Sequence, residues 1–318
     1  METNLNGPLR RHMDRVKEIL NDYSENAPGR VSEVIGPLLT SHGKLLRPAY
    51  LIISSMFGNG PNEKIYQIAA SLELFHIATL AHDDIIDQAD ERRGTQTINS
   101  HWGPKNAVLA GDYLLAAALG NGSKYADPKK ITGLTAIISR ICAGEIDQSF
   151  DRYNFNISYR TYLRRITAKT ALLFAAAGHL GAEDSDCGAD IKQNLRRAGL
   201  NLGISFQIID DILDMTGGAG KSHFADIKNG IPSLPILLAI KENKNVIGLL
   251  PKKARKSKAR GIPGGAKFIL EKTNSLNEAK DKAEYYIQRG NKEIAKLPAG
   301  KAKELLSSFY NSLLHRNY

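Results

Sequence analysis

The sequence predicts an all-α protein that folds as a single-domain helical bundle. Apolar residues recur at three- and four-residue spacing in segment after segment, which is the period of one helix face. Gly and Pro fall mostly between these segments, where they mark loops. Hydrophobic residues make up 42% of the 318 residues, enough to bury a large core. No segment reads as a linker between independent cores, so we expect one domain spanning residues 1–318.

Helices are expected wherever the three- and four-residue spacing is sustained. In chain order they span residues 9–20, 65–82, 107–119, 131–146, 161–180, 191–215, 234–242 and 276–297. The segments "LAGDYLLAAAL" and "TALLFAAAGHL" are rich in small residues and apolar on nearly every side, which indicates central positions in a bundle. The helices at 65–82 and 191–215 both run into clusters of aspartate. Loops rich in Gly and Pro follow at 58–64, 120–130 and 216–233.

The net charge of +10 is concentrated in one place. Between residues 251 and 267 the basic residues are Lys252, Lys253, Arg255, Lys256, Lys258, Arg260 and Lys267. Gly and Pro punctuate this stretch, so we expect an exposed basic loop, with peripheral contact to anionic lipid as the less favoured alternative. No aromatic residues interleave with the charges, which argues against a nucleic-acid partner.

The chain has no targeting or disulfide signal. It contains no run of about twenty apolar residues, and its first twenty residues mix charged and apolar types, so a cytoplasmic location is expected. Cys142 and Cys187 lie far apart without neighbours that would suggest a zinc or redox site. Both are predicted to be buried free thiols.

Two aspartate motifs, "HDDIID" and "IDDILD", are the strongest functional signal. Residues four apart share a helix face, so Asp83 lies beside Asp87, and Asp210 beside Asp214. An acidic solvent-facing surface is the ordinary alternative, but isoleucine and leucine fill the intervening positions. Carboxylates without His or Cys suit Mg²⁺, which usually shares its coordination shell with substrate phosphates. The two motifs therefore suggest a diphosphate held through magnesium.

Basic residues near the first motif fit a phosphorylated ligand. Lys44 and Arg47 belong to "GKLLRP", and Arg92 and Arg93 follow "DDIID". A guanidinium group matches phosphate oxygens with two parallel hydrogen bonds. Each residue alone could be a surface charge, but their grouping favours a second phosphate site.

An ordered set of motifs gives the chain a wider resemblance. The set comprises "GKLLRP", "ELFHIATLAHDDIID", "RRG", "GDYLL", "GEIDQ", "KT" at 169–170 and "FQIIDDILD". From about residue 40 to the C-terminus the chain resembles the trans-isoprenyl diphosphate synthases, which join isopentenyl diphosphate to an allylic diphosphate. The resemblance implies a bundle of the isoprenoid synthase type with a central cavity, a homodimer, and products used in isoprenoid biosynthesis, including quinone side chains.

The resemblance also implies roles for the residues around the allylic diphosphate. Three magnesium ions would be held by Asp83, Asp87 and Asp210. Support for that shell would come from Asp84, Asp211 and Asp214. Direct contacts with the same diphosphate would come from Arg92, Lys169 and Lys221.

The remaining implied roles concern the second substrate and the reacting carbon. Isopentenyl diphosphate would be bound by Lys44, Arg47, His76 and Arg93. From the residues alone, His76 could equally be a core histidine. Thr170 and Gln207 would face the allylic cation with their dipoles. The released diphosphate would take up the final proton.

One loop departs from the family pattern. After the second motif the family commonly reads GKxxGxDxxxGKxT. Here Gly220, Lys221 and Asp226 are kept, whereas Ala225 and Ile231 stand where Gly and Lys are usual. The missing lysine is a feature of catalytic subunits similar to heptaprenyl diphosphate synthase component II, which act with a small partner. A heteromer with a small regulatory subunit is therefore a further expectation.

Product length is expected to depend on the helix before the first motif. By resemblance, Ala78 and Thr79 would face the product tunnel one turn from Asp83, with Phe75 one turn deeper. Short-chain members tend to carry aromatic residues at the first turn, which is open here. The two-residue spacer in "DDIID" also differs from the four-residue spacer of the bacterial farnesyl type. A product between hexaprenyl and octaprenyl is expected, although Phe75 could equally be ordinary core packing.

Four other functions share part of this pattern. A short-chain geranylgeranyl or farnesylgeranyl diphosphate synthase would share every motif. A class I terpene cyclase would share the fold and an aspartate motif but would not need an isopentenyl diphosphate site. A noncatalytic partner subunit would not need two intact aspartate motifs. A nucleic-acid-binding protein would spread its positive charge more widely.

Overall fold

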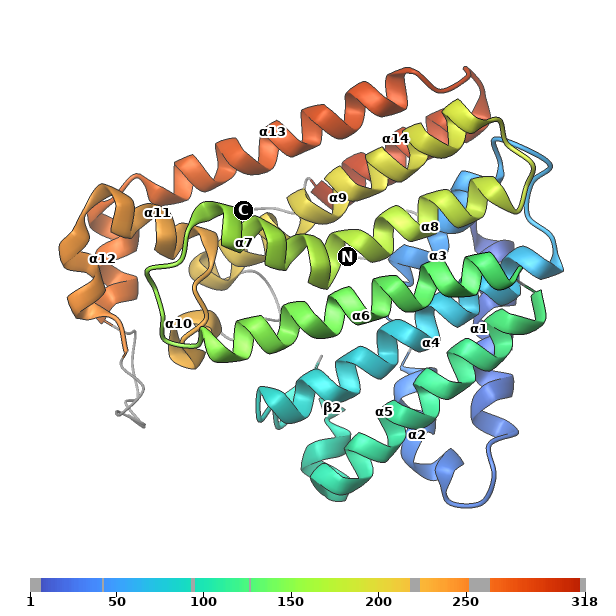
Figure 1. The fold of residues 1–318 in the computed structure, drawn as a ribbon, viewed down its shortest axis with the longest axis horizontal. Coiled ribbons are helices and arrows are strands. Elements are labelled where there is room, and N and C mark those ends of the chain that lie inside the picture. Colours follow the sequence, from blue (N-terminus) through green and yellow to red (C-terminus); the bar gives the residue numbers. More distant parts are fainter. Residues whose placement is uncertain are drawn as a thin grey trace. The chain divides into compact units, whose positions relative to one another are not determined.

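The computed structural model describes residues 7–41, 43–92, 95–125, 127–217, 224–251 and 264–314. These residues are almost entirely helical, which confirms the predicted all-α class (Figure 1). The described strands are β1 (Glu91–Arg92) and β2 (Thr95–Gln96), which pair antiparallel as a short hairpin. The basic loop predicted near 251–267 lies largely outside the described residues.

The chain packs as two compact units, each assembled from three separate stretches. Unit 1 comprises Met1–Thr135, Ala176–Arg196 and Lys296–Phe309. Unit 2 comprises Ala136–Ala175, Arg197–Ala295 and Tyr310–Tyr318. The helices α6 (Pro128–Phe150), α8 (Leu172–Glu183), α9 (Ala189–Thr216) and α14 (Lys301–Leu314) contribute residues to both. A single folding domain remains a prediction.

Unit 1 is built around one long central helix. Its N-terminal helices are α1 (Arg10–Glu25), α2 (Val31–Thr40), α3 (Leu46–Ser55), α4 (Glu63–Ile86) and α5 (Ile98–Tyr125). Helix α4 packs along α5 and also contacts the other three (Figure 1). The Asn62 side chain starts α4 by accepting the Ile65 N–H at 3.1 Å. Burial of α4 on most sides explains its apolar sequence.

Close helix contacts in unit 1 depend on glycine. A Cβ at Gly181 of α8 would lie 2.1 Å from the Leu51 carbonyl oxygen on α3. One turn earlier, a Cβ at Gly178 would collide with Leu195 and the Tyr50 ring. The Tyr50 hydroxyl donates to the Leu195 carbonyl at 2.7 Å. These contacts hold α3 against the unit 1 segments of α8 and α9.

Unit 2 surrounds the second aspartate motif. Besides its parts of the shared helices, its elements are α7 (Tyr159–Ile166), the π-helical turn η1 (Thr167–Ala171), α10 (Ala225–Asn229), α11 (Leu234–Glu242), the 3₁₀ turn η2 (Lys244–Leu249), α12 (Gly264–Lys272) and α13 (Ser275–Ala295). Phe155, Met215, Phe224 and Ile227 belong to one buried apolar cluster. This cluster anchors the end of α9 against the elements that follow it.

The structure corrects several sequence expectations. The segment 120–130, expected as a loop, is largely helical, because α5 runs to Tyr125 and α6 begins at Pro128. The helix predicted over 161–180 is interrupted by the π turn at Thr167–Ala171. Cys187 is buried as expected, but Cys142 is exposed, because α6 has only one buried residue, Ile141. Within the described part of the chain, no helix is long and apolar enough to cross a membrane.

Candidate active site

The first aspartate motif lies at the C-terminal end of α4. Asp83 is in the last turn, and Asp87 is the residue that directly follows the helix. The Asp87 N–H donates to the Asp83 carbonyl at 2.8 Å, so the predicted placement of both residues on one helical turn is confirmed. Both side chains are half-buried, whereas Asp84 between them is only 3% exposed. The motif therefore offers two accessible carboxylates and one buried carboxylate.

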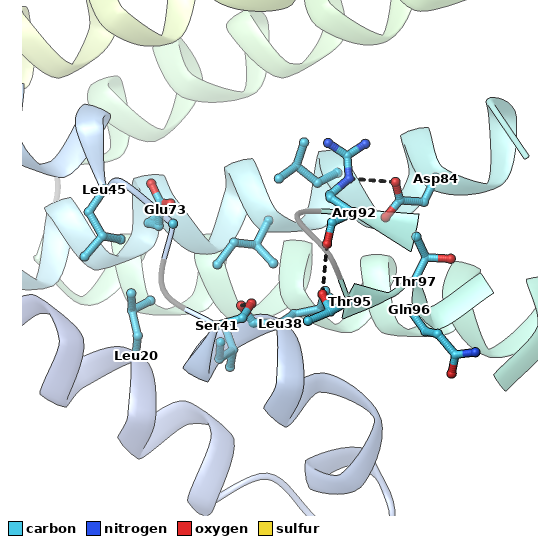
Figure 2. Close-up of a pocket in the computed structure, with 14 residues that line it drawn as sticks. Leu20, Leu38, Ser41, Leu45, Glu73, Asp84, Arg92, Thr95, Gln96 and Thr97 are labelled. Atoms are coloured by element: carbon cyan, nitrogen blue, oxygen red, sulfur yellow. Dashed lines mark hydrogen bonds and ion pairs between the residues drawn. The ribbon is translucent and has the colours of Figure 1, made fainter. Parts of the chain in front are cut away.

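The hairpin after the motif returns Arg92 to Asp84. Gln88 has a left-handed backbone with φ of 52°, and the chain reverses there so that β1 and β2 follow. Arg92 donates from Nε to Asp84 Oδ1 at 2.7 Å, and its two terminal nitrogens point away from that carboxylate (Figure 2). Burial raises the pKa of Asp84, and the charge of Arg92 opposes this shift. The ion pair thus holds Arg92 by one nitrogen.

A cavity of about 140 Å³ adjoins this ion pair within unit 1. Leucines from α1 and α2 line one wall, and Ile77 and Leu80 of α4 line another. Its polar boundary includes Glu73, the Asp84–Arg92 pair and the hairpin residues 95–97 (Figure 2). Gly43, from the "GKLLRP" motif, also contributes to the lining. The first aspartate motif and the glycine of that loop therefore border one space.

The other predicted residues of unit 1 occupy α3, α4 and the loop before α3. Lys44 is exposed, and Arg47 and His76 are half-buried. The proposed chain-length residues share α4 with His76, and Phe75 and Ala78 are buried. Thr79 is half-buried and donates its hydroxyl to the His76 carbonyl at 2.7 Å. Arg93 lies outside the described residues.

In unit 2, the "KT" motif lies on the π turn. A Cβ at Gly203 of α9 would be 2.4 Å from the Ala171 Cα, so α9 approaches this turn closely only because residue 203 is glycine. On the other side, a Cβ at Gly144 of α6 would be 3.0 Å from the Ala168 Cβ. The Lys169 ammonium group lies 2.9 Å from Glu145 Oε1. Two small residues and one ion pair therefore fix the turn, a conformation frequent at functional sites.

A chain of hydrogen bonds links the π turn to the second aspartate motif. The Thr170 hydroxyl donates to Gln207 Oε1 at 2.7 Å, and Gln207 Nε2 donates to Asp211 Oδ1 at 3.2 Å. Asp211 Oδ2 accepts from the Tyr162 hydroxyl at 2.8 Å and from the Leu234 N–H at 3.0 Å. Burial raises the pKa of Asp211 to about 6, although these hydrogen bonds lower it. The structure thus brings together Thr170, Gln207 and Asp211, all predicted from the sequence.

The other aspartates of the second motif differ from Asp211. Asp214 is 7% exposed, and its two carboxylate oxygens accept the N–H groups of Ala225 and Asp226 at 3.0 and 3.2 Å. It therefore fastens the start of α10 to the end of α9. Asp210 is half-buried. Lys221 and Gly220 lie outside the described residues.

The donor chemistry of the motifs fits a magnesium ion that completes its shell with substrate. Among the described residues, no group of three or more His, Cys, Asp or Glu side chains is arranged to hold a metal ion. Mg²⁺ is usually bound by one or two carboxylates together with phosphate oxygens and water. Half-buried Asp83, Asp87 and Asp210 could supply such carboxylates.

Sequence reasoning missed three residues that shape the site. Glu145 belongs to the quoted "GEIDQ" motif, but its pairing with Lys169 required the fold. Tyr162 lies eight residues before Thr170, a spacing that carries no signal for a contact with Asp211. Gly203 sits within an apolar helix, where a glycine is a sign of close backbone approach.

Comparisons with known proteins agree with this arrangement. The polyprenyl synthetase family matches residues 29–260. Heptaprenyl diphosphate synthase component 2 of Bacillus subtilis (strain 168) is 37% identical over 286 residues, covering 88% of this chain and 81% of that protein. The crystal structure of heptaprenyl diphosphate synthase from Staphylococcus aureus matches with a TM-score of 0.90 and 34% identity, covering 100% of both chains.

A third relative was solved with ligands. Polyprenyl synthase from Caulobacter crescentus CB15, complexed with calcium and isoprenyl diphosphate, matches with a TM-score of 0.87 and 29% identity. The match covers 97% of this chain and 96% of that one. The family match includes both aspartate motifs, the "KT" turn and the loop that contributes Gly43. The chain belongs to the polyprenyl synthetase family, a family of prenyltransferases.

Proposed function

We propose that this chain condenses isopentenyl diphosphate with an allylic diphosphate to make a trans-polyprenyl diphosphate between hexaprenyl and octaprenyl. The observation that carries the proposal is family membership across residues 29–260 with both aspartate motifs intact. The heptaprenyl names of the Bacillus and Staphylococcus relatives favour a medium chain over a geranylgeranyl or farnesylgeranyl product.

The allylic diphosphate is bound by carboxylates through metal and by cations directly. Asp83, Asp87 and Asp210 would hold three magnesium ions, and the calcium complex of the Caulobacter relative supports a divalent metal. Bound magnesium supplies neutralising charge for the departing diphosphate. Around it, the cationic contacts are made by Arg92, Lys169 and Lys221. Asp84 holds Arg92 by Nε, so its terminal nitrogens are directed away toward a ligand.

Isopentenyl diphosphate occupies a separate site made by Lys44, Arg47, His76 and Arg93. Its double bond attacks the allylic carbon once the carbon–oxygen bond to diphosphate has weakened. Thr170 and Gln207 lower the energy of the allylic cation by directing dipoles toward it. The diphosphate that leaves takes the proton lost from the new chain, so no protein base is required.

Homodimerisation is supported by apolar side chains that remain exposed in each unit. Leu109 on α5 is 55% exposed in unit 1, and Phe150 on α6 is 85% exposed in unit 2. Side chains this large and apolar are commonly covered by a partner. The name "component 2" of the Bacillus relative and Ile231 in place of a lysine further support a small second subunit. The chain is proposed to work in the cytoplasm, with the basic loop available for peripheral membrane contact.

The deciding experiment is an extension assay. Purified protein is given Mg²⁺, farnesyl diphosphate and radiolabelled isopentenyl diphosphate, and dephosphorylated products are sized by chromatography. We expect labelled products between hexaprenol and octaprenol, and no product from Asp83→Ala or Asp210→Ala. The assay is repeated with a component 1 subunit of heptaprenyl diphosphate synthase, while light scattering reports the mass of each mixture.

Other outcomes point to the alternatives. Conversion of farnesyl diphosphate to an unlabelled hydrocarbon would identify a terpene cyclase. Products no longer than geranylgeraniol or farnesylgeraniol would identify a short-chain synthase. No incorporation with or without the second subunit would indicate a noncatalytic partner. A monomeric mass at micromolar concentration would rule out the homodimer.

A further inference from the structure

We propose that Asp211 is a positioning residue that sets the direction of the Thr170 hydroxyl by determining which way the Gln207 amide points. This inference rests on the proposed function, in which Thr170 and Gln207 face the allylic cation. It assigns to Asp211 a task that differs from metal binding. The task is to ensure that the oxygen of Thr170, and not its proton, is presented to substrate.

The Asp211 carboxylate is held by donors from two other elements. Asp211 Oδ2 receives hydrogen bonds from the Tyr162 hydroxyl and the Leu234 N–H. A backbone N–H only donates, and Tyr162, 3% exposed and with its pKa raised well above the usual value by burial, keeps its proton. Asp211 is therefore held as an acceptor by groups on α7 and at the start of α11. Its other oxygen faces Gln207.

The carboxylate determines the orientation of the amide. An ionised carboxylate accepts hydrogen bonds but donates none, so the end of Gln207 that faces Asp211 must be its NH₂ group. The Nε2–Oδ1 distance of 3.2 Å agrees with that contact. A glutamine amide has a donor end and an acceptor end, so its carbonyl oxygen must then face Thr170.

The amide in turn determines the direction of the hydroxyl. Gln207 Oε1 and Thr170 Oγ1 are 2.7 Å apart, and two oxygen atoms approach this closely only with a proton between them. Only Thr170 can supply that proton. Its single O–H is thereby used, and the lone pairs of its oxygen remain for any other contact. The hydroxyl therefore presents its negative end to the substrate.

The reverse orientation would oppose the reaction. If the amide were turned over, its NH₂ group would donate to Thr170 Oγ1 and release the hydroxyl proton to point elsewhere. A positive dipole end would then be available to an allylic cation, where it raises the energy of the charged state. The tight approach of α9 at Gly203 keeps Thr170 and Gln207 in contact. Asp211 selects between the two orientations of that contact.

The test is a substitution that reverses the orientation with little change in shape. In Asp211→Asn, the asparagine oxygen would still accept from Tyr162 and Leu234, so its NH₂ group would face Gln207 and turn that amide over. We expect kcat for the extension of farnesyl diphosphate to fall on the order of ten-fold or more. KM for farnesyl diphosphate and the half-saturating Mg²⁺ concentration should change little, because both carboxylate oxygens of Asp211 are already engaged by Tyr162, Leu234 and Gln207.

A double-mutant cycle separates positioning from general damage. Thr170→Val removes the hydroxyl, whereas Thr170→Ser keeps it and should retain most of the activity. In the Thr170→Val background, Asp211→Asn should cause a clearly smaller further loss, because only its effect on the Gln207 amide remains. The same fold-loss in both backgrounds, or a large shift in the Mg²⁺ requirement, would overturn the positioning role.

A readout independent of turnover follows the amide itself. With glutamine side chains labelled with ¹⁵N, the nuclear Overhauser effect between the Gln207 NH₂ protons and the Thr170 methyl group should be weaker in the native protein than in Asp211→Asn, because the flipped amide brings its NH₂ group next to Thr170. An effect of equal or greater intensity in the native protein would overturn the inference, even if extension activity is normal. A native protein that extends no substrate would instead overturn the proposed function, and with it the catalytic meaning of this chain of bonds.

A second variant covers the case in which Asp211→Asn does not fold. Gln207→Met keeps the length of the side chain and removes both ends of the amide, leaving the Thr170 hydroxyl undirected. Its loss of kcat should again be smaller in the Thr170→Val background, because only the direct contribution of the Gln207 dipole is then left to lose. Additive losses for this pair would overturn the inference.

Discussion

At the residue scale, the two aspartate motifs share a division between exposed and buried carboxylates. In both, the second aspartate is enclosed: Asp84 is 3% exposed and Asp211 is 5% exposed, and in the second motif Asp214, 7% exposed, is enclosed as well. Asp84 and Asp211 are each engaged by a side chain from another element, Arg92 in the first case and Tyr162 in the second. The aspartates of one motif therefore differ in role, because a buried carboxylate with such a partner is fixed in place, whereas a half-buried one remains accessible.

Separate substrate sites predict separable kinetic defects. Asp83→Ala should abolish activation of the allylic substrate, because it removes a proposed metal ligand. Arg47→Ala should mainly raise the concentration of isopentenyl diphosphate needed for half-maximal rate. Each loss in kcat/KM should exceed about ten-fold, or roughly 1.4 kcal/mol. Steady-state kinetics with each substrate varied in turn is the measurement, and indistinguishable defects would contradict the assignment.

The half-buried histidine of α8 predicts a loss of stability in mild acid. Burial lowers the pKa of His179, and the positive charge of Arg196 lowers it further, although Glu183 raises it. The unfolded chain therefore binds this proton more readily than the folded protein. As the pH falls below 6.5, the ordinary pKa of histidine, the free energy of unfolding should decrease. The decrease should stop once the pH lies below the lowered pKa of His179 in the folded protein.

Matched substitutions isolate this effect. His179→Gln should flatten the fall in the unfolding free energy between about pH 7 and pH 5, measured by urea denaturation. His101→Gln, at an exposed position of α5, should leave the slope as it is in the native protein. Equal slopes for all three proteins would refute the assignment to His179.

The sequence indicates the acidic residues, Thr170 and Gln207 through a resemblance, because their types and order are shared with a family. It did not predict their hydrogen-bond partners. Tyr162 and Asp211 lie 49 positions apart in the chain. Such a contact depends on how α7 and α9 pack, and nothing in either segment alone specifies it.

At the element scale, the approach of α9 to the π turn predicts a strong effect of one methyl group. Gly203→Ala would place a Cβ 2.4 Å from the Ala171 backbone, so the helices must separate. Overpacking of this kind costs about 1–3 kcal/mol. It should also lengthen the Thr170–Gln207 contact and lower kcat. Chemical denaturation and the extension assay measure the two consequences.

Gly133→Ala is the matched control for this substitution. Gly133 lies within α6, and a Cβ there would meet nothing within 4 Å. Alanine is the better helix former, so stability should stay the same or rise by up to about 1 kcal/mol. A similar loss in both variants would show that backbone conformation, and not the close approach, explains the effect at Gly203.

The α4 helix also carries the prediction for product length. Ala78→Phe should shorten the product sharply by placing a ring across the first turn beyond Asp83. Phe75→Ala should lengthen the product if that ring is the tunnel floor, and should leave it unchanged if the ring is only core packing. Chromatography of the dephosphorylated products distinguishes these results. An unchanged product from folded, active Ala78→Phe would remove the residue-level support for a long chain.

The folding of Phe75→Ala must be checked before its products are read. Phe75 is 3% exposed, and removing a buried ring of this size costs roughly 3–5 kcal/mol. Circular dichroism and thermal unfolding provide the control. The sized products are then compared at a temperature where both proteins remain folded.

Periodicity predicted the long helices but not the elements between them. The strands β1 and β2 are two residues each, too short to show any period. The π turn has no local signal in the sequence, because the apolar spacing of a helix continues through residues 161–180. The wider π turn fits because its neighbours on α6 and α9 are Gly144 and Gly203. Helices α2 and α3 are ten residues each and contain proline, too short and interrupted for a clear period.

At the scale of the whole molecule, the proposed binding of diphosphate through magnesium predicts that metal and diphosphate bind together. An allylic diphosphate analogue together with Mg²⁺ should raise the melting temperature, because it neutralises carboxylates that otherwise repel one another. Either component alone should do less. The melting temperature is measured by differential scanning fluorimetry with and without chelator. If the diphosphate analogue raised the melting temperature equally in excess chelator, binding of the diphosphate through metal would be excluded.

The interleaving of the two units has a consequence for how the protein emerges from the ribosome. Unit 1 contains the first aspartate motif, yet it also contains Lys296–Phe309, which is synthesised long after that motif. The early helices therefore wait, without part of their packing surface, until this later stretch has emerged. A nascent chain stalled before residue 296 should remain a client for chaperones however many helices it has formed. Neither unit corresponds to a contiguous stretch of coding sequence that recombination could transfer by itself.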